Sequence, residues 1–87
     1  MKAADSELPR YRSHKEVRAV QIEKVIPTAG GGAEIVPVDA GISPFTVEAA
    51  YMKKHKPEAG GYYVVYSDGY ESWSPKEAFE QGYTRIK

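Results

Sequence analysis

The chain has 87 residues, which is the length of one domain, and its twelve Lys and Arg balance its twelve Asp and Glu. A dedicated DNA-binding domain carries a strong basic excess, so a formal net charge of zero argues against that class. The absence of cysteine excludes disulfides and thiolate chemistry, and with the polar start MKAAD and no membrane-length apolar stretch it predicts a cytoplasmic protein without a membrane partner.

The first forty residues predict an arm followed by a hairpin. Residues 1–10 lack a hydrophobic period, so we expect a flexible arm that precedes a single domain over residues 11–87. β-branched residues are concentrated in 17–26, which predicts a half-buried strand. A second strand over 33–38 follows three glycines and should pair with the first in antiparallel fashion. Pro37 cannot donate a ladder hydrogen bond, so the second strand should lie at an edge or end there.

The middle of the chain predicts a helix. Residues 39–45 form a turn-rich connector, and Thr46 then has the side chain of a helix N-cap. Residues 47–55 follow helical spacing, with an acidic residue in the first turn and lysines at the end, as the helix dipole favours. Pro57 and the two glycines at 60 and 61 should end this helix.

The segment YYVVYSDGYESWS, Tyr62 to Ser74, predicts a second hairpin. Asp68-Gly69 between two β-forming runs favours a two-residue type I′ turn, which places Val64 opposite Trp73. The face that contains this pair should belong to the core: Tyr62, Val64, Tyr66, Glu71 and Trp73. The other face should be partly open to water: Tyr63, Val65, Ser67, Tyr70 and Ser72.

The end of the chain predicts a short helix and a last strand. Ser74 should cap a helix over 75–81 through a capping box with Glu77, and Gly82 should end it. Residues 83–86 then predict a strand. The element order is therefore β-β-α-β-β-α-β, an α+β fold with an antiparallel sheet of about five strands and two short helices.

The residues that carry chemistry in other proteins do not converge in this sequence. His14 and His55 are far apart in the chain, and no carboxylate spacing matches a zinc or calcium site, so we expect no metal. Serines and carboxylates of the second hairpin have local roles in turns and caps, so we expect no catalytic residues and no enzyme. The glycine loop at 30–32 lacks the GK[ST] ending of a phosphate loop, and we expect no cofactor.

Two basic stretches leave a ligand-binding alternative open. They are Arg10-Tyr11-Arg12-Ser13-His14-Lys15 and Lys53-Lys54-His55-Lys56. The net charge of zero and the absence of RNA-binding aromatic motifs argue against nucleic acid as a partner. A nucleotide held by a homodimer or larger oligomer is an alternative, in which tyrosines stack the base and four residues contact phosphate: Arg10, Arg12, Lys53 and Lys54.

Tyrosines on the second hairpin are the best candidates for a contact surface. Tyr63, Tyr70 and Ser72 share the predicted second face, and a protein or a planar ligand could bind such tyrosines among small residues. Tyr11 and Arg12 would join them if the arm folds back. The alternative is that the second helix covers this face.

Two segments resemble small uncharacterised proteins of tailed bacteriophages and prophages. These segments are Tyr11-Arg12 with VRAVQIEKV, and GGYYVVYSDGYESWSPKEAFEQGYTRI at 60–86. The resemblance implies a bacterial cytoplasm and a viral accessory role, and it brings no catalytic residues. Small phage accessory proteins often inhibit host machinery, including defence systems.

These observations lead to one functional hypothesis and three rivals. The leading hypothesis is a non-catalytic phage accessory protein that binds a host or phage protein through its tyrosine-rich hairpin. Nucleotide sequestration, nucleic-acid binding and a minor role in the virion are the alternatives.

Overall fold

The computed structural model describes residues 8–12 and 16–85, and of Arg12, Thr84 and Arg85 it describes the backbone alone. The elements of these residues are β1 (Arg10–Arg12), β2 (Glu16–Pro27), the 3-10 turn η1 (Ala29–Gly31), β3 (Ala33–Pro37), β4 (Phe45–Val47), α1 (Ala49–His55), β5 (Tyr62–Val65), β6 (Glu71–Ser74), α2 (Lys76–Gly82) and β7 (Thr84–Arg85). Every strand pair is antiparallel, and the α+β prediction is confirmed.

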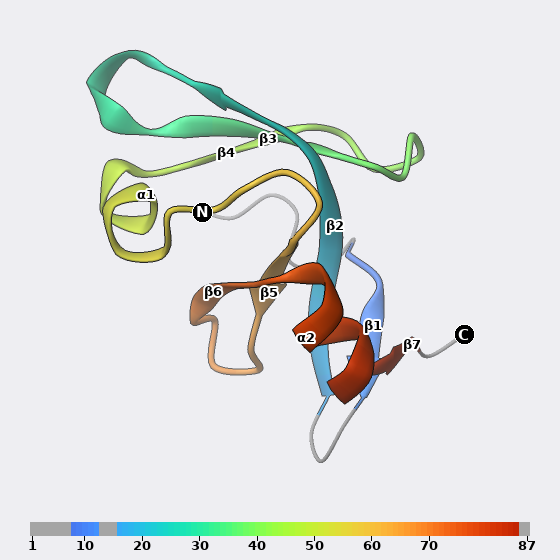
Figure 1. The fold of residues 1–87 in the computed structure, drawn as a ribbon. Coiled ribbons are helices and arrows are strands. Elements are labelled where there is room, and N and C mark those ends of the chain that lie inside the picture. Colours follow the sequence, from blue (N-terminus) through green and yellow to red (C-terminus); the bar gives the residue numbers. More distant parts are fainter. Residues whose placement is uncertain (1–7, 13–15, 86–87) are drawn as a thin grey trace.

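The twelve-residue strand β2 organises the sheet. Its first half lies between β1 and β5, and its second half pairs with β3. A register irregularity between Ile22 and Lys24 marks the change of neighbours. Figure 1 shows β2 as a long curved strand that links β3 and β4 at one end of the molecule to β1 and β7 at the other. Bulges of this kind bend a strand and increase its twist.

The larger core lies on the face of β2 that carries Val20 and Ile22. Its buried residues come from the N-terminal segment, β2, β3, β4, α1 and β5: Leu8, Val20, Ile22, Ala33, Ile35, Val47, Tyr51, Tyr63 and Val65. Trp73 and Phe45 pack against them. Even residues of β2 supply this core, as the alternation of side chains along a strand requires.

A second core lies between the sheet and α2. Val17 and Ala19 of β2, with Tyr62 and Val64 of β5, contact the buried Phe79 of α2. Because odd residues of β2 face this side, the first half of β2 is buried on both faces. Figure 1 shows α2 lying across this end of β2.

The N-terminal part of the fold differs from the prediction. Residues 1–7 of the predicted arm lie outside the described residues, but Leu8 is 2% exposed and Arg10 already pairs with Arg18. The packed chain therefore begins at Leu8 at the latest, not at Tyr11. β1 is a strand that the sequence did not predict, because its three residues are too few to show a period.

The predicted connector and first helix are also corrected. Phe45 of the connector forms β4 together with Thr46 and Val47, and β4 pairs with β3, so β3 ends at Pro37 as expected but is not an edge. Thr46 lies in β4 and cannot cap the helix. Helix α1 begins at Ala49 after Glu48, whose side chain makes no capping hydrogen bond.

The second hairpin has its strands where predicted but a different register. Val64 lies opposite Ser72, and Tyr63 lies opposite Trp73. The Tyr66 N–H donates to the Tyr70 carbonyl at 2.9 Å, so the loop contains three residues, the last of which is Gly69 with φ of 89°. Three-residue loops with a left-handed third residue are a common hairpin type. The one-residue shift exchanges the faces of β6, and the predicted pairing of Val64 with Trp73 is wrong.

The predicted capping box at the second helix is absent. Ser74 is the last residue of β6 and pairs with Tyr62. Pro75 occupies the N-cap position, α2 begins at Lys76, and no side chain caps it. The final strand is confirmed as β7, which pairs with β1.

We expect Gly69→Ala to destabilise the domain by about 1 kcal/mol, because an L-residue at this positive φ is strained. A Cβ at Gly69 meets no atom within 4 Å, so the loss would come from the backbone alone. Urea unfolding of Gly69→Ala beside Gly69→Asn measures it, since Asn tolerates the left-handed region better. Equal stability of the wild type and Gly69→Ala would contradict the loop assignment.

Candidate functional site

Tyr63 does not belong to an exposed tyrosine face. It is 1% exposed, its ring packs against Phe45 and Tyr51, and its hydroxyl donates to the Glu71 carboxylate. Tyr63 pairs with Val20 of β2 on one side and with Trp73 of β6 on the other, and all three contribute to the larger core. The structure therefore removes Tyr63 from the predicted contact surface.

Tyr70 remains exposed at the end of the same hairpin. Its side chain is 43% exposed. Among the described residues, Tyr70 is one of three large hydrophobic residues that are exposed to solvent. Ser72 is half-buried, and its carbonyl accepts a hydrogen bond from the Tyr51 hydroxyl at 2.8 Å. The structure therefore separates the predicted set into an exposed Tyr70, a half-buried Ser72 and a buried Tyr63.

A hollow of about 280 Å³ lies between α1 and the start of β6, beside Tyr70. Lys54 Nζ is 5.0 Å from the centroid of the Tyr70 ring, and the His55 ring meets the same tyrosine edge-on at 5.9 Å. Tyr51 and Glu71 form the inner wall. We name this region, made of Tyr51, Lys54, His55, Tyr70 and Glu71, the Tyr70 surface.

The packing of α1 on β6 changes the acidity of two groups of the Tyr70 surface. Burial, and then the charge of Glu71, raise the pKa of Tyr51 well above its ordinary value of 10.0. Burial and the neighbouring Lys54 charge lower the pKa of His55, although Glu71 opposes them. His55 therefore tends to be neutral beside Tyr70 near neutral pH.

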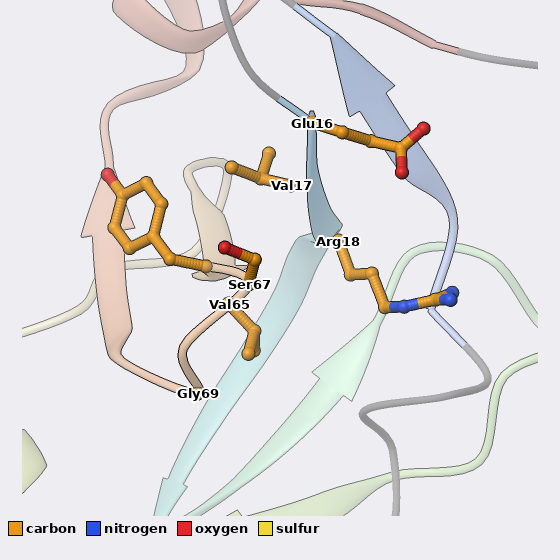
Figure 2. A pocket seen from close by; sticks show the side chains of 7 residues that line it. Glu16, Val17, Arg18, Val65, Ser67 and Gly69 are labelled. Carbon is orange, nitrogen blue, oxygen red and sulfur yellow. The ribbon is translucent and has the colours of Figure 1, made fainter.

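A second hollow, of about 400 Å³, lies on the other side of the β5–β6 turn. Its walls come from the start of β2 and from the turn: Glu16, Val17, Arg18, Val65, Tyr66, Ser67 and Gly69. Figure 2 shows Glu16 and Arg18 projecting to one side of β2 and Val17 toward the turn. Tyr66 stacks on Tyr70 with ring centroids 6.0 Å apart. Gly69 of the turn lines both hollows.

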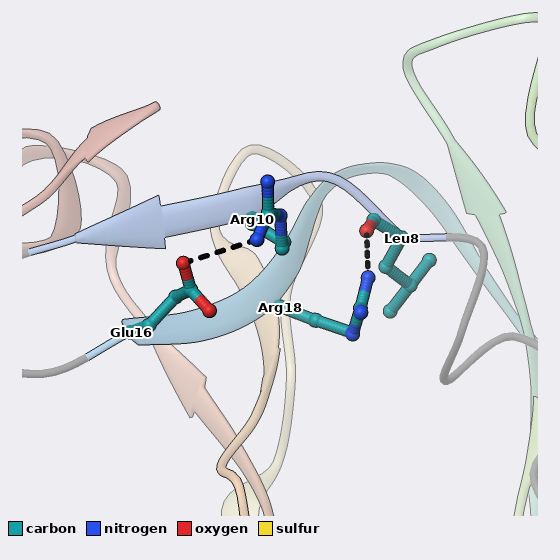
Figure 3. A network of polar contacts seen from close by, with 4 residues as sticks. All are labelled: Leu8, Arg10, Glu16 and Arg18. Atoms are coloured by element: carbon teal, nitrogen blue, oxygen red, sulfur yellow. Dashed lines mark hydrogen bonds and ion pairs between the residues drawn. The ribbon is translucent and has the colours of Figure 1, made fainter. Parts of the chain in front are cut away.

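Tyr11 and Arg10 of β1 are engaged with the sheet. The Tyr11 ring is half-buried and meets the rings of Tyr62 and Phe79 edge-on. Arg10 pairs with Glu16 at 3.3 Å, and the Arg18 guanidinium donates to the Leu8 carbonyl at 3.2 Å, as Figure 3 shows. These contacts hold the N-terminal segment on β2.

The four residues predicted to contact phosphate are not brought together by the described contacts. Arg10 lies on β1 in an ion pair, whereas Lys53 and Lys54 lie at the end of α1, and Lys54 is over Tyr70. The backbone of Arg12 pairs with Glu16 and Thr84, and its side chain is outside the described part of the chain. No observation thus supports a shared phosphate site.

Within residues 8–12 and 16–85, no three His, Cys, Asp or Glu side chains gather closely enough to hold a metal ion. No helix in that part of the chain has the length and apolar character needed to cross a membrane. His14, one of the two histidines considered as ligands, lies outside the described residues.

Sequence reasoning identified Tyr70 but missed its partners, Lys54 and His55. The run Lys53-Lys54-His55-Lys56 was visible as positive charge at a helix end. Its position beside the hairpin depends on how α1 packs against β6, through the Tyr51 hydroxyl and the Ser72 carbonyl. No local pattern carries that information.

We expect stability to fall as the pH rises above about 10. Burial raises the pKa of Tyr51, and burial with the Glu80 hydrogen bond raises the pKa of Tyr62, both above 10.0. The unfolded chain then loses these protons first, so the stabilisation is complete below about pH 10 and is lost above it. Urea unfolding at about pH 8 and about pH 10.5 tests this, and Tyr62→Phe should reduce the difference. An unchanged free energy of unfolding between the two would contradict it.

The sequence and the structure were then compared with known proteins. No protein-family model matches the sequence, and no curated protein matches it. Among solved structures, the monomeric form of the phage L decoration protein, determined by NMR in solution, is similar, with a TM-score of 0.69 and 28% sequence identity. The match covers 90% of this chain and 59% of the other, so the chain spans about three fifths of that protein's length. This likeness to a phage protein agrees with the resemblance to small phage-encoded proteins.

Proposed function

We propose that this chain is a non-catalytic phage accessory protein that attaches to the protein shell of a phage particle. The observation that carries the proposal is the likeness of this chain to the phage L decoration protein in both sequence and fold. The match covers 90% of this chain. Decoration in this sense requires a surface for binding a shell protein, not a site for chemistry.

The features of the described residues agree with this proposal. Two hollows of the described residues border the β5–β6 turn and are open to solvent. An exposed tyrosine such as Tyr70 belongs to the residue types that are enriched in protein contact surfaces. A rigid sheet with two cores is a suitable base for such a surface, because its backbone need not change on binding.

Co-sedimentation with empty capsids tests the proposal. The capsids should come from the phage or prophage whose genome encodes this chain, and capsids of an unrelated phage are the matched control. We expect the protein to migrate with its own capsids in a sucrose gradient and to saturate them at a fixed ratio. Failure to migrate with them at micromolar concentration would overturn the proposal.

A host protein as target is the alternative within the same class. It predicts the opposite pair of results, namely no capsid binding and the capture of one host protein from uninfected cells.

Nucleotide sequestration predicts a rise in melting temperature when a nucleotide is added. The rise corresponds to a stabilisation of about 2.7 kcal/mol at a nucleotide concentration of a hundred times Kd.

A further inference from the structure

The basic end of α1 is not neutralised within the described part of the fold. Lys53, Lys54 and Lys56 are exposed, and the ion pair found between described residues joins Arg10 to Glu16 instead. Lys54 lies over an aromatic ring, which leaves its charge accessible from solvent.

The carboxylates of the adjacent hairpin are engaged internally. Asp68 Oδ1 accepts the Tyr70 N–H at 2.9 Å, which fixes the turn. The half-buried Glu71 carboxylate accepts the Tyr63 hydroxyl. Glu48, the other acidic residue lining the hollow, lies at the opposite end of α1. Beside Tyr70, the lysines at the end of α1 are therefore exposed to a partner, while the half-buried Glu71 keeps its negative charge at the hollow.

The hollow beside Tyr70 adds an apolar component. Its volume of about 280 Å³ is enough for one or two side chains, and the Tyr70 ring forms an exposed wall. The ring is held from two sides by Lys54 and His55, so a partner would order few additional rotamers on binding. A rigid aromatic residue of this kind is a frequent anchor in interfaces.

We propose that the Tyr70 surface docks an acidic segment of the partner protein, with an apolar side chain beside Tyr70 and carboxylates on the lysines at the end of α1. The inference rests on the proposed attachment to a shell protein and names the face and the chemistry of that contact. An acidic peptide fits better than nucleic acid because the positive charge is confined to one helical turn, whereas a strand of phosphates needs a longer basic track.

An NMR titration with a random copolymer of glutamate and tyrosine tests the surface directly. We expect the largest amide shifts at 53–56 and 69–71, and a several-fold weaker affinity when salt is raised from about 50 to about 200 mM. Shifts centred elsewhere, or affinity that does not depend on salt, would overturn the proposal. Tighter binding of single-stranded DNA at the same residues would overturn the choice of an acidic peptide.

Single-residue variants provide a second test of the Tyr70 surface. Tyr70→Ala and Lys54→Glu should each weaken copolymer binding about tenfold. Val38→Ala and Lys76→Glu are the matched controls, because Val38 is 52% exposed and Lys76 is an exposed lysine on α2. Both controls should bind as the wild type does. Amide spectra of all four establish that each variant is folded, and equal losses in variants and controls would refute the surface.

The same four variants on capsids separate this inference from the proposed function. If the wild type binds capsids and Tyr70→Ala binds equally well, attachment is correct and this face is not the one used. If the wild type binds no capsid but the copolymer maps to the Tyr70 surface, the surface recognises acidic segments and the attachment to a shell is wrong.

Discussion

Phe79→Ala is expected to remove most of the stability of the domain, by about 3–5 kcal/mol. Phe79 is 1% exposed and connects α2 to the sheet. Its ring stacks on Tyr62 at 4.2 Å and on Tyr83 at 4.7 Å, and it meets Tyr11 edge-on at 4.7 Å. A domain of this size has a free energy of unfolding near the lower end of about 5–15 kcal/mol. Urea unfolding followed by circular dichroism measures the loss.

Phe79→Leu is the matched control for that experiment. Leucine keeps most of the buried apolar volume but removes the aromatic stacking, so we expect a loss of about 1–2 kcal/mol. A loss below about 1 kcal/mol in Phe79→Ala would show that α2 contributes little to the fold, in conflict with the second core.

Gly61→Ala is expected to destabilise the domain by about 1–3 kcal/mol, because it overpacks a buried position. A Cβ on Gly61 would lie 2.5 Å from both Cζ2 and Nε1 of Trp73. The indole packs against the larger core and cannot withdraw without leaving a space there. Trp73 is the one tryptophan of the chain, so its fluorescence reports the displacement directly.

Gly82→Ala serves as the control for Gly61→Ala. A Cβ on Gly82 meets no atom within 4 Å, and the residue is the last of α2. Alanine at such a position leaves the free energy of unfolding unchanged or raises it by up to about 1 kcal/mol. The same result for Gly61→Ala would mean that Gly61 and Trp73 are not packed as described.

The pattern of β-branched residues predicted most strands, whereas register depended on tertiary packing. Asp68-Gly69 is compatible with a two-residue loop and with a three-residue loop whose last residue is left-handed. The two registers differ in whether Val64 or Tyr63 faces Trp73. Because β5 is buried on both faces, its side chains show no alternation that could distinguish them.

Two other differences arise from competition between local and distant partners. Ser74 has the side chain of an N-cap, but strand pairing with Tyr62 takes its backbone instead. Leu8 is an isolated apolar residue in a polar segment, yet it packs in the larger core, and its carbonyl accepts a hydrogen bond from Arg18. Neither the strand pairing of Ser74 nor the burial of Leu8 follows from hydrophobic periodicity along the chain. Neither could therefore be predicted from the sequence.

The pairing of β1 with β7 has a consequence for how the protein is made. Tyr11 lies opposite Arg85, so the first and last strands are neighbours although most of the chain separates them. Long-range pairings of this kind carry the highest loop-closure entropy and slow folding. During synthesis, β1 therefore cannot complete its strand pairing until β7 has been translated. We expect this edge of the sheet to form late and to open first in hydrogen exchange.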